Sequence, residues 1–310
     1  MEGWVQVLIY FAALLLLAAP LGSYIAKVLE GERTFLSPLL GWMERGVLLT
    51  SGVDPKGQQN WKQYAVTMIV INAVGALVVY AIQRLQGILP LNGLSLPGVS
   101  PDSSFNTAVS FVTNTNWQGY AGESAMSHLT QMLALGVQNF LSAATGISVM
   151  AALTRGIRSK ESSELGSAWV DLTRIVVHIL LPLSLLLAVF LASQGVVQTF
   201  QPSLKGNLLQ PTEGANKEII TEQVIPLGPA ASQVAIKQLG TNGGGYYNTN
   251  SAHPLENPTP LSNFVQCLAI LLIPAALCLT FGQMIRDRRQ GWALLAAMTI
   301  LLALFTVPTV

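Results

Sequence analysis

Six long apolar runs constrain this chain more than any other feature of its sequence. An α-helix needs about 20 apolar residues to cross roughly 30 Å of hydrocarbon. Runs of that kind cover Trp4–Lys27, Tyr64–Gln83, Leu129–Leu153, Ile175–Ser193, Phe264–Met284 and Trp292–Val310. The first run lacks a basic segment ahead of it, with Glu2 as the only charge there, so we expect a permanent span rather than a secretory signal. We therefore predict an all-α membrane protein that crosses the bilayer repeatedly.

Composition supports a membrane environment and excludes two other classes of protein. Hydrophobic residues make up 51% of the chain and charged residues 10%, which leaves too little polar surface to solvate a compact domain of 310 residues. The net charge of +1 argues against a nucleic-acid binder, which needs a basic face. Cys267 and Cys278 lie in one apolar run, too far apart on a helix to form a disulfide and without metal-site spacing.

The cations predict the orientation of the chain, because cytoplasmic segments next to spans retain Lys and Arg. Three connecting segments are rich in cations: Arg33, Arg45, Lys56 and Lys62 in the first, Arg155, Arg158, Lys160 and Arg174 in the third, and Arg286, Arg288 and Arg289 in the fifth. The second segment has no Lys or Arg between Leu85 and Glu123, and residues 194–263 hold only three Lys. We expect these two segments, and the N-terminus, to lie outside.

The two outside segments repeat one pattern. In each, a short semi-apolar piece that cannot span, 103–112 or 230–239, is followed directly by an uncharged polar strip. The first strip is Thr113, Asn114, Thr115, Asn116, Trp117 and Gln118, and the second is Gly240, Thr241, Asn242, Gly243, Gly244 and Gly245. A repeat of helix, re-entrant loop and helix is typical of pores and transporters. We predict two such membrane-pore-membrane repeats after a leading transmembrane helix.

The chemistry of the strips favours a cation. Backbone that is not helical is tolerated at membrane depth only where it lines water or is buried in protein. Strips of Thr, Asn and Gly can direct successive carbonyl oxygens toward an ion and replace the hydration shell of potassium. The short helix ahead of each strip would point its partially negative C-terminal end toward the same path. The alternative is that each strip is an ordinary solvated turn.

Five strings of residues carry a specific resemblance. They are Phe111–Gln118, Val137–Ala144, Gly240–Gly245, His253–Thr259 and Asp287–Gly291. The chain resembles, from its first span to its last, the KdpA family, the A subunit of the Kdp potassium-transporting ATPase. That family is similar to potassium channels, with four membrane-pore-membrane repeats after an extra leading helix. Its members work in the bacterial inner membrane with a P-type ATPase B subunit, a C subunit and a small F peptide.

The resemblance implies a function and a division of the chain. Potassium would bind from outside at a filter of backbone carbonyls and pass to the B subunit, whose ATP hydrolysis drives uptake; this chain would have no catalytic site and no organic cofactor. Residues 1–63 would form the leading helix and a cytoplasmic loop, 64–154 the first repeat, 155–286 the second repeat with an outer loop at 194–229, and 287–310 the start of a third.

Two strips cannot surround an ion, so the length of the chain leaves alternatives open. The chain is either the N-terminal half of a longer subunit or one of two copies that pair into a four-strip pore. A third possibility is a truncated fragment that does not conduct. The rival from another class is a membrane-embedded enzyme, which would need converging acids, bases or metal ligands, whereas the strips hold amides, hydroxyls and glycines.

The resemblance also assigns roles to residues. Thr113 to Gln118 would be the first filter strand and Thr241 to Gly245 the second, with Gln118 and Gly243 at positions that set potassium affinity and selectivity. Tyr246 and Tyr247 would be the aromatic support behind the loop. From the residues themselves, Glu123 is either an acidic collar of the outer vestibule or a helix-start carboxylate facing the N-terminal dipole. We expect His253 at the outer vestibule and 194–229 as a cap over the pore mouth.

Five further polar or titratable residues lie in or next to the spans. We expect His128 and His178 to be interface residues rather than metal ligands, because no second ligand lies at helical spacing. Asn72 and the pair Gln138 and Asn139 are intramembrane amides, which face a neighbour or a cavity rather than lipid.

Overall fold

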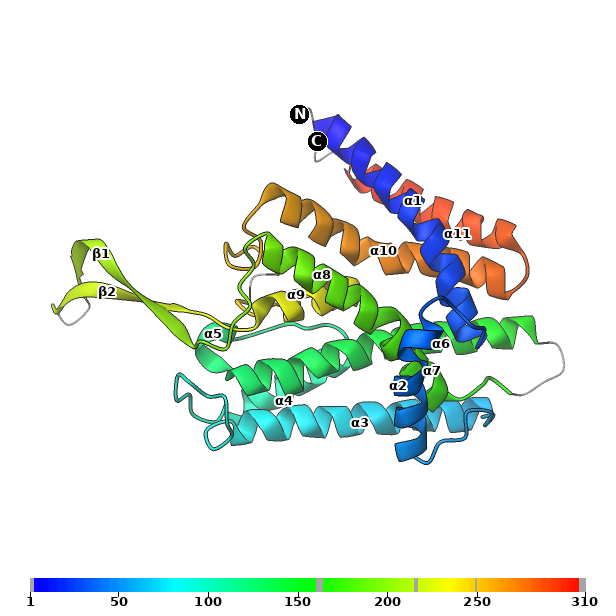
Figure 1. Cartoon of the computed structure of the whole chain (residues 1–310), viewed down its shortest axis with the longest axis horizontal. Helices are drawn as coiled ribbons and strands as arrows, with labels where there is room; N and C mark the ends of the chain where they lie inside the picture. Colours follow the sequence, from blue (N-terminus) through cyan, green and yellow to red (C-terminus); the bar gives the residue numbers. More distant parts are fainter. Residues whose placement is uncertain (1–2, 160–163, 215–216, 249, 307–310) are drawn as a thin grey trace.

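The computed structural model describes residues 3–159, 164–214, 217–248 and 250–306. Within these residues six helices are long and apolar enough to cross a membrane, which confirms the six predicted spans (Figure 1). They are α1 Gly3–Leu29, α3 Trp61–Leu85, the continuous helix Thr130–Arg158, the continuous helix Ala168–Ser193, α10 Pro260–Met284 and α11 Arg288–Thr306. The last four residues of the sixth predicted run lie outside the described residues.

Two of the spans begin with capping residues that the sequence supplies. The Asn60 side chain accepts from the backbone N–H of Gln63 and the Gln63 side chain accepts in return, so both orphan N–H groups at the start of α3 are satisfied. Thr259 and Ser262 form the same reciprocal pair ahead of α10, and Pro260 takes the first helical position, where its missing N–H costs nothing.

The two central spans each contain a π-helical segment. Thr130–Arg158 consists of η1 Thr130–Gly136 and α6 Val137–Arg158; Ala168–Ser193 consists of α7 Ala168–Arg174, η2 Ile175–Leu180 and α8 Leu181–Ser193. Pro182, just after η2, has no N–H to offer the carbonyl of His178 four residues earlier. The hydroxyl of Tyr24 in α1 donates to that carbonyl at 2.7 Å. A neighbouring helix therefore satisfies the oxygen that proline leaves open.

Four shorter helices complete the helical part: α2 Ser37–Thr50, α4 Pro101–Val112, α5 Gly122–Ala125 and α9 Ala230–Leu239. The order long helix, short helix, long helix occurs twice, with α4 between α3 and α6 and α9 between α8 and α10. The short pieces predicted at 103–112 and 230–239 are therefore helices, the second with the predicted bounds. Ten residues rise only about 15 Å, so α9 does not span.

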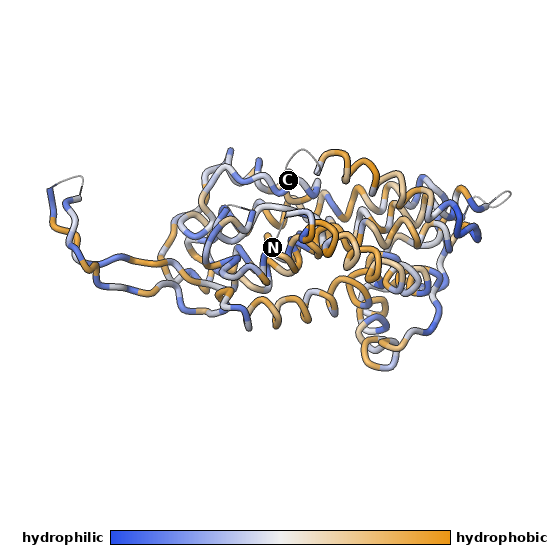
Figure 2. Tube along the Cα trace, turned by 90° about the horizontal axis from the view of Figure 1, so that it is seen from above, coloured by the Kyte–Doolittle hydropathy of each residue, from blue (hydrophilic) through white to orange (hydrophobic). Residues whose placement is uncertain are grey.

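The core lies between α1, α6, α8, α9 and α10. All residues of α9 except Ser232 are buried, which places this short helix inside the bundle. Large apolar side chains such as Leu16, Ile69 and Leu185 are exposed on the outer faces of the long helices, the arrangement expected where lipid is the solvent. Figure 2 shows the same distribution, with the long helices hydrophobic and the polar colours concentrated toward the ends of the bundle.

An ion pair between Arg155 and Asp171 connects four helices at one end of the bundle. Arg155 donates to both carboxylate oxygens of Asp171, at 2.6 and 2.9 Å, and to the backbone carbonyl of Leu29 at 2.9 Å. The hydroxyl of Tyr64 also donates to Asp171, at 2.9 Å. Helices α1, α3, α6 and α7 thus meet at one carboxylate whose oxygens are paired, as a buried charge requires.

The segment 194–229 departs from the prediction of an all-α chain. It forms an antiparallel hairpin of β1 Ser203–Glu213 and β2 Ile219–Pro226, with an irregularity between Asn207 and Thr212. The hairpin is largely exposed and projects away from the helices in Figure 1, so within this chain it is an arm and not a cap. The β-branched residues of 219–226 favour a strand, a signal that the loop's Pro, Gly and Gln content obscured.

Candidate functional site

The two polar strips begin where the two short helices end. Thr113 follows α4 directly and Gly240 follows α9. The partially negative C-terminal ends of both helices therefore point at the start of a strip, as the sequence predicted. Helix α9 is almost entirely buried, whereas α4 buries one face only.

The strips lie side by side, although about 130 residues separate them in the chain. The side-chain NH2 of Asn114 donates to the carbonyl of Gly240 at 3.2 Å, and that of Asn242 donates to the amide oxygen of Asn114. At the other end, Gln118 donates to the carbonyl of Gly245 at 3.1 Å and accepts from its N–H at 2.9 Å. Four hydrogen bonds thus join the two strips directly.

Helix α6 supports both strips from one side. Asn116 donates to the side-chain oxygen of Asn139 at 2.6 Å, and Ser142 donates to Asn114 at 2.8 Å. Asn242 donates to Ser142 at 3.0 Å and to the carbonyl of Asn139 at 3.3 Å. The predicted interior amide Asn139 therefore faces the strips and not lipid. The amides form one network whose members hold each other in place.

Both strips contain residues in the left-handed region. Asn114 and Asn116 have φ of 60° and 51° in the first strip; Thr241, Gly243 and Gly244 have φ of 53°, 83° and 66° in the second. Asn and Gly adopt this conformation readily, whereas for the β-branched Thr241 it is uncommon and costs on the order of 1 kcal/mol or more. The strips are therefore neither helix nor strand, and their carbonyls do not follow either ladder.

Side chains of the first strip alternate between two environments. Asn116 and Gln118 are buried and make the contacts described above, whereas Thr113, Thr115 and Trp117 are exposed. The second strip shows the same division, with Asn242 buried and Thr241 exposed. Each strip thus has one side anchored in the protein and one open side.

A buried ion pair that sequence reasoning missed lies behind the second strip. The Lys237 ammonium contacts a carboxylate oxygen of Glu256 at 2.7 Å and donates to the carbonyl of Gly244 at 2.8 Å. The other oxygen of Glu256 accepts from the N–H of Tyr247 at 2.8 Å. Both side chains are almost fully buried. Because the two charges compensate each other, the pair fixes the loop without adding net charge beside the strip.

Two carbonyls of the second strip already accept hydrogen bonds from side chains of the protein. The carbonyl oxygen of Gly244 faces Lys237 and that of Gly245 accepts from Gln118. A side chain at either glycine has no room: a Cβ at Gly244 would lie 2.8 Å from the carbonyl of Asn116, and one at Gly245 would lie 2.6 Å from the Lys237 ammonium. These two glycines are therefore part of the packing behind the strip.

Open acceptors and a cavity lie next to the strips. The side-chain oxygens of Asn116 and Asn242 are buried without a hydrogen-bond partner among the described residues. A cavity of about 160 Å³ begins at Asn114 and Thr241 and continues between α6 and α10 toward Ile147 and Leu277 near the middle of both helices. The lining is polar at the start of the cavity and apolar beyond it.

The predicted vestibule residues flank the aromatic support. His253 stacks on Tyr247 with ring centroids 4.2 Å apart, and Tyr247 contacts Tyr246 at 5.0 Å. Glu123 lies in the short helix α5 and has one carboxylate oxygen buried without a partner in the described residues. Tyr246 and Tyr247 donate to the carbonyls of Leu227 and Pro226, which anchors the base of the hairpin to the second strip's loop.

Of the remaining polar residues, His178 and Asn72 contact neighbouring helices and His128 contacts the segment after β2. His128 bonds the carbonyl of Leu227 at 2.9 Å, and His178 contacts the carboxylate of Glu44 at 2.8 Å. Asn72 donates to the hydroxyl of Thr145 at 3.2 Å. Among the described residues, no three metal-ligating His, Cys, Asp or Glu side chains gather where they could hold a metal.

Six spans and two inward short helices define a multi-pass membrane protein with an uncharged polar site in its interior. The chain matches the family model of the potassium-transporting ATPase A subunit, KdpA, over residues 8–310, and it belongs to that family. The predicted resemblance is thereby confirmed.

Curated relatives agree with this assignment. The chain is 58% identical, over 309 residues, to the potassium-transporting ATPase potassium-binding subunit of Sorangium cellulosum, covering 100% of this chain and 53% of that protein. It is also 58% identical to the subunit of that name from Herpetosiphon aurantiacus, covering 98% and 52%, and 54% identical to that from Bordetella pertussis, covering 96% and 54%. The chain thus spans about half the length of the curated relatives it matches.

Proposed function

We propose that this chain is part of the potassium-binding and translocating subunit of an ATP-driven potassium uptake complex. Potassium enters from outside, binds at the two strips and passes to a partner that hydrolyses ATP. The observation that carries the proposal is the junction of the strips at the C-terminal ends of α4 and α9, held by interior amides. The relatives' shared name, potassium-binding subunit, supports the choice of ion.

The geometry refines which atoms contact the ion. We assign the ion contacts to the open side of Thr113–Asn116 and Thr241–Gly243, together with the free amide oxygens of Asn116 and Asn242. Gly244 and Gly245 support the loop, because their carbonyls are already bound by Lys237 and Gln118. Carbonyl and amide oxygens without carboxylates bind a monovalent ion while allowing it to leave.

The topology and partners follow the same proposal. The hairpin lies at one end of the bundle and the cation-rich connections at the other, which supports an outer N-terminus (Figure 1). By the family assignment, the membrane would be a bacterial inner membrane. We assign residues 64–154 and 155–286 to two membrane-pore-membrane repeats, each with one strip. The B, C and F subunits of a Kdp complex would be the partners, and the ATPase chemistry would reside in B.

Substituting Gln118 and Gly243 in the intact pump tests the filter. Gln118→Ala removes both bonds to Gly245, and Gly243→Ala forces alanine to a φ of 83° although nothing closer than 3.4 Å blocks its Cβ. We expect each variant to weaken the apparent potassium affinity at least tenfold and to reduce discrimination against rubidium and sodium.

Matched controls lie on the hairpin. Gln223→Ala and Gly206→Ala change the same residue types at positions remote from the strips, where Gln223 is exposed and a Cβ at residue 206 meets nothing within 4 Å. The controls should behave as the parent pump. Unchanged affinity and unchanged ion discrimination in both strip variants, with normal assembly, would refute the filter assignment.

A further inference from the structure

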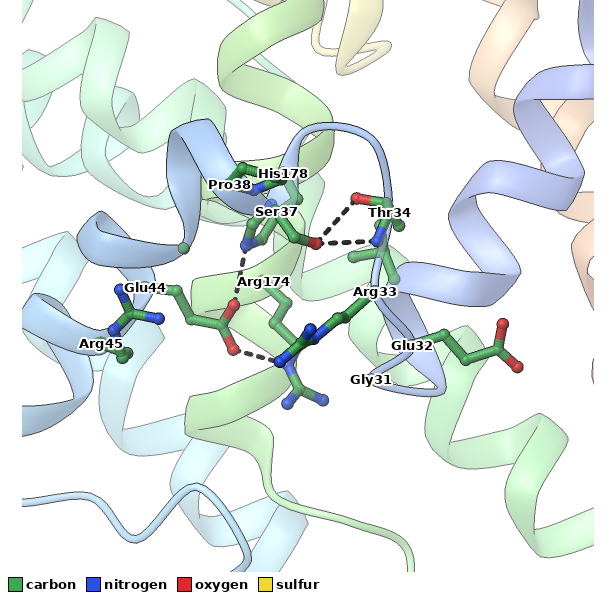
Figure 3. Close-up of a pocket in the computed structure, with 12 residues that line it drawn as sticks. Gly31, Glu32, Arg33, Thr34, Ser37, Pro38, Glu44, Arg45, Arg174 and His178 are labelled. Carbon is green, nitrogen blue, oxygen red and sulfur yellow. Dashed lines mark hydrogen bonds and ion pairs between the residues drawn. The ribbon is translucent and has the colours of Figure 1, made fainter.

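A basic cavity lies at the end of the bundle opposite the strips. It has a volume of about 510 Å³ and is enclosed by the turn after α1, by α2, and by Arg174 and His178 of the fourth span (Figure 3). The cation distribution places this end of the bundle in the cytoplasm. The cavity is therefore remote from the potassium site and from every residue used in the proposed function.

The charges around this cavity do not balance. Glu44 accepts from Arg174 at 2.9 Å and contacts His178 at 2.8 Å, and these bonds, the one from His178 first, lower the pKa of Glu44 to about 2. Its charge is thus committed to Arg174. Arg33 and Arg45 also line the cavity but form no ion pair with any described residue. Glu32, the other acid of the lining, points away from the cavity in Figure 3.

One wall of the cavity carries a further unsatisfied polar atom. His178 is 4% exposed, and its Nδ1 is buried without a hydrogen-bond partner among the described residues. Buried polar atoms of this kind are normally paired, so the site lacks a partner for it. The two unpaired guanidinium groups of Arg33 and Arg45 form a site for an anion, because guanidinium groups favour phosphate oxygens.

An exposed apolar row borders the same cavity. Phe35, Leu39, Trp42 and Leu49 follow the spacing of one helical face and are 79%, 66%, 65% and 81% exposed. Helix α2, which carries all but the first, has 14 residues and rises about 21 Å, too little to cross roughly 30 Å of hydrocarbon. In Figure 1 it runs crosswise to the long helices at their cytoplasmic ends. A helix with one polar and one apolar face in this position lies in the membrane interface.

We propose that this cavity binds the headgroup of an anionic phospholipid of the cytoplasmic leaflet. Arg33 and Arg45 would pair with the phosphate, and the acyl chains would lie along the exposed row of Phe35, Leu39 and Trp42. Charge complementarity selects an anionic headgroup, and the apolar row next to the basic pocket selects a lipid over a soluble phosphate, which would leave that row uncovered. Trp42 has the amphipathic ring that interfaces favour.

The test uses the complete complex with its full-length subunit, in nanodiscs of phosphatidylcholine with a photoreactive phosphatidylglycerol. After illumination, the labelled peptides are mapped and the bound lipid is quantified. We expect label on residues 33–49, and in Arg33→Gln/Arg45→Gln we expect it to fall roughly tenfold or more, because each basic residue near the surface contributes to anionic lipid binding. Arg33→Lys/Arg45→Lys keeps the charge and should keep most of the label.

A matched control removes two cations on the same side of the membrane but away from the cavity. Arg288 and Arg289 are exposed at the start of α11, and Arg288→Gln/Arg289→Gln should label as the parent does. Inorganic phosphate in excess should not displace the label. Equal labelling of the cavity variant and the control, displacement by phosphate, or crosslinks from α2 to another subunit in place of lipid would each overturn the proposal. Potassium affinity is expected to stay unchanged, so a failed filter assignment would leave this test intact.

Discussion

At the residue scale, the conformation of the strips is set by the side chains that hold them and not by those on their open side. The side-chain amides of Gln118, Asn114 and Asn242 form hydrogen bonds with the neighbouring strip or with α6. Lys237 and Glu256 hold the buried side of the second strip's loop by hydrogen bonds to the carbonyl of Gly244 and the N–H of Tyr247. Because each of these groups is buried, a change in charge or length there transmits directly to the backbone of the loop.

The Lys237 and Glu256 pair gives a double-mutant prediction. Glu256→Gln keeps an acceptor for the N–H of Tyr247 but leaves the Lys237 ammonium buried without its counter-charge. We expect this variant to lose about 3–5 kcal/mol of stability and to weaken potassium binding, since an uncompensated cation then lies beside the strip. Thermal unfolding and the potassium dependence of ATPase activity in the intact complex measure the two effects.

The double variant Lys237→Met/Glu256→Gln provides the control. It removes the unpaired charge, so it should be more stable than Glu256→Gln alone, even though the carbonyl of Gly244 loses its donor. A double variant that is no more stable than the single one would show that the two side chains act separately and not as an ion pair.

At the scale of single elements, α4 and α9 were the easiest to predict and the hairpin the hardest. The apolar spacing of 230–239 ends at Gly240, which marks the boundary of α9 in sequence and structure alike. The hairpin has no buried face, so hydrophobic alternation could not reveal it. The pairing of Lys237 with Glu256 was equally hidden, because it joins a helix to a loop across 19 residues and Lys237 resembles an ordinary outer-loop cation.

The proline after η2 gives a prediction for the fourth span. Tyr24→Phe removes the donor to the His178 carbonyl, which Pro182 cannot replace. We expect a loss of about 1–2 kcal/mol, the usual result of leaving a buried carbonyl unpaired. Pro182→Ala supplies a backbone N–H, so the loss from Tyr24→Phe should be smaller in that background. An equal loss in both backgrounds, by thermal unfolding, would contradict this account.

At the scale of the whole molecule, the bundle has two differently equipped ends. The strips are built from uncharged amides, hydroxyls and glycines, and the Lys237 and Glu256 charges behind them compensate each other, whereas the opposite end carries the Arg155 and Asp171 group and the basic cavity. The cation count along the sequence predicted this asymmetry, because it depends only on composition next to the spans. The cation count could not predict that Arg155 pairs with Asp171 while Arg33 and Arg45 stay unpaired, because ion pairing depends on which helices contact each other.

The arrangement of the strips predicts the behaviour of this 310-residue chain by itself. Two strips side by side leave Thr115 and Thr241 on an open side, so under the proposed function they would contact an ion from part of its circumference only. We expect the chain reconstituted alone into vesicles to give no potassium-selective flux. Selective uptake by the chain alone would show that two copies complete a pore, the alternative that its sequence leaves open.

The bonds between the strips also limit how such a protein can move. Asn114, Gln118 and Asn242 fasten one strip to the other at both ends, and α6 fastens both to the same helix. Separating the strips would break several amide hydrogen bonds at once, so we expect the two strips to move as one rigid unit. A transport cycle that opens and closes around the strips is expected to place its hinge elsewhere.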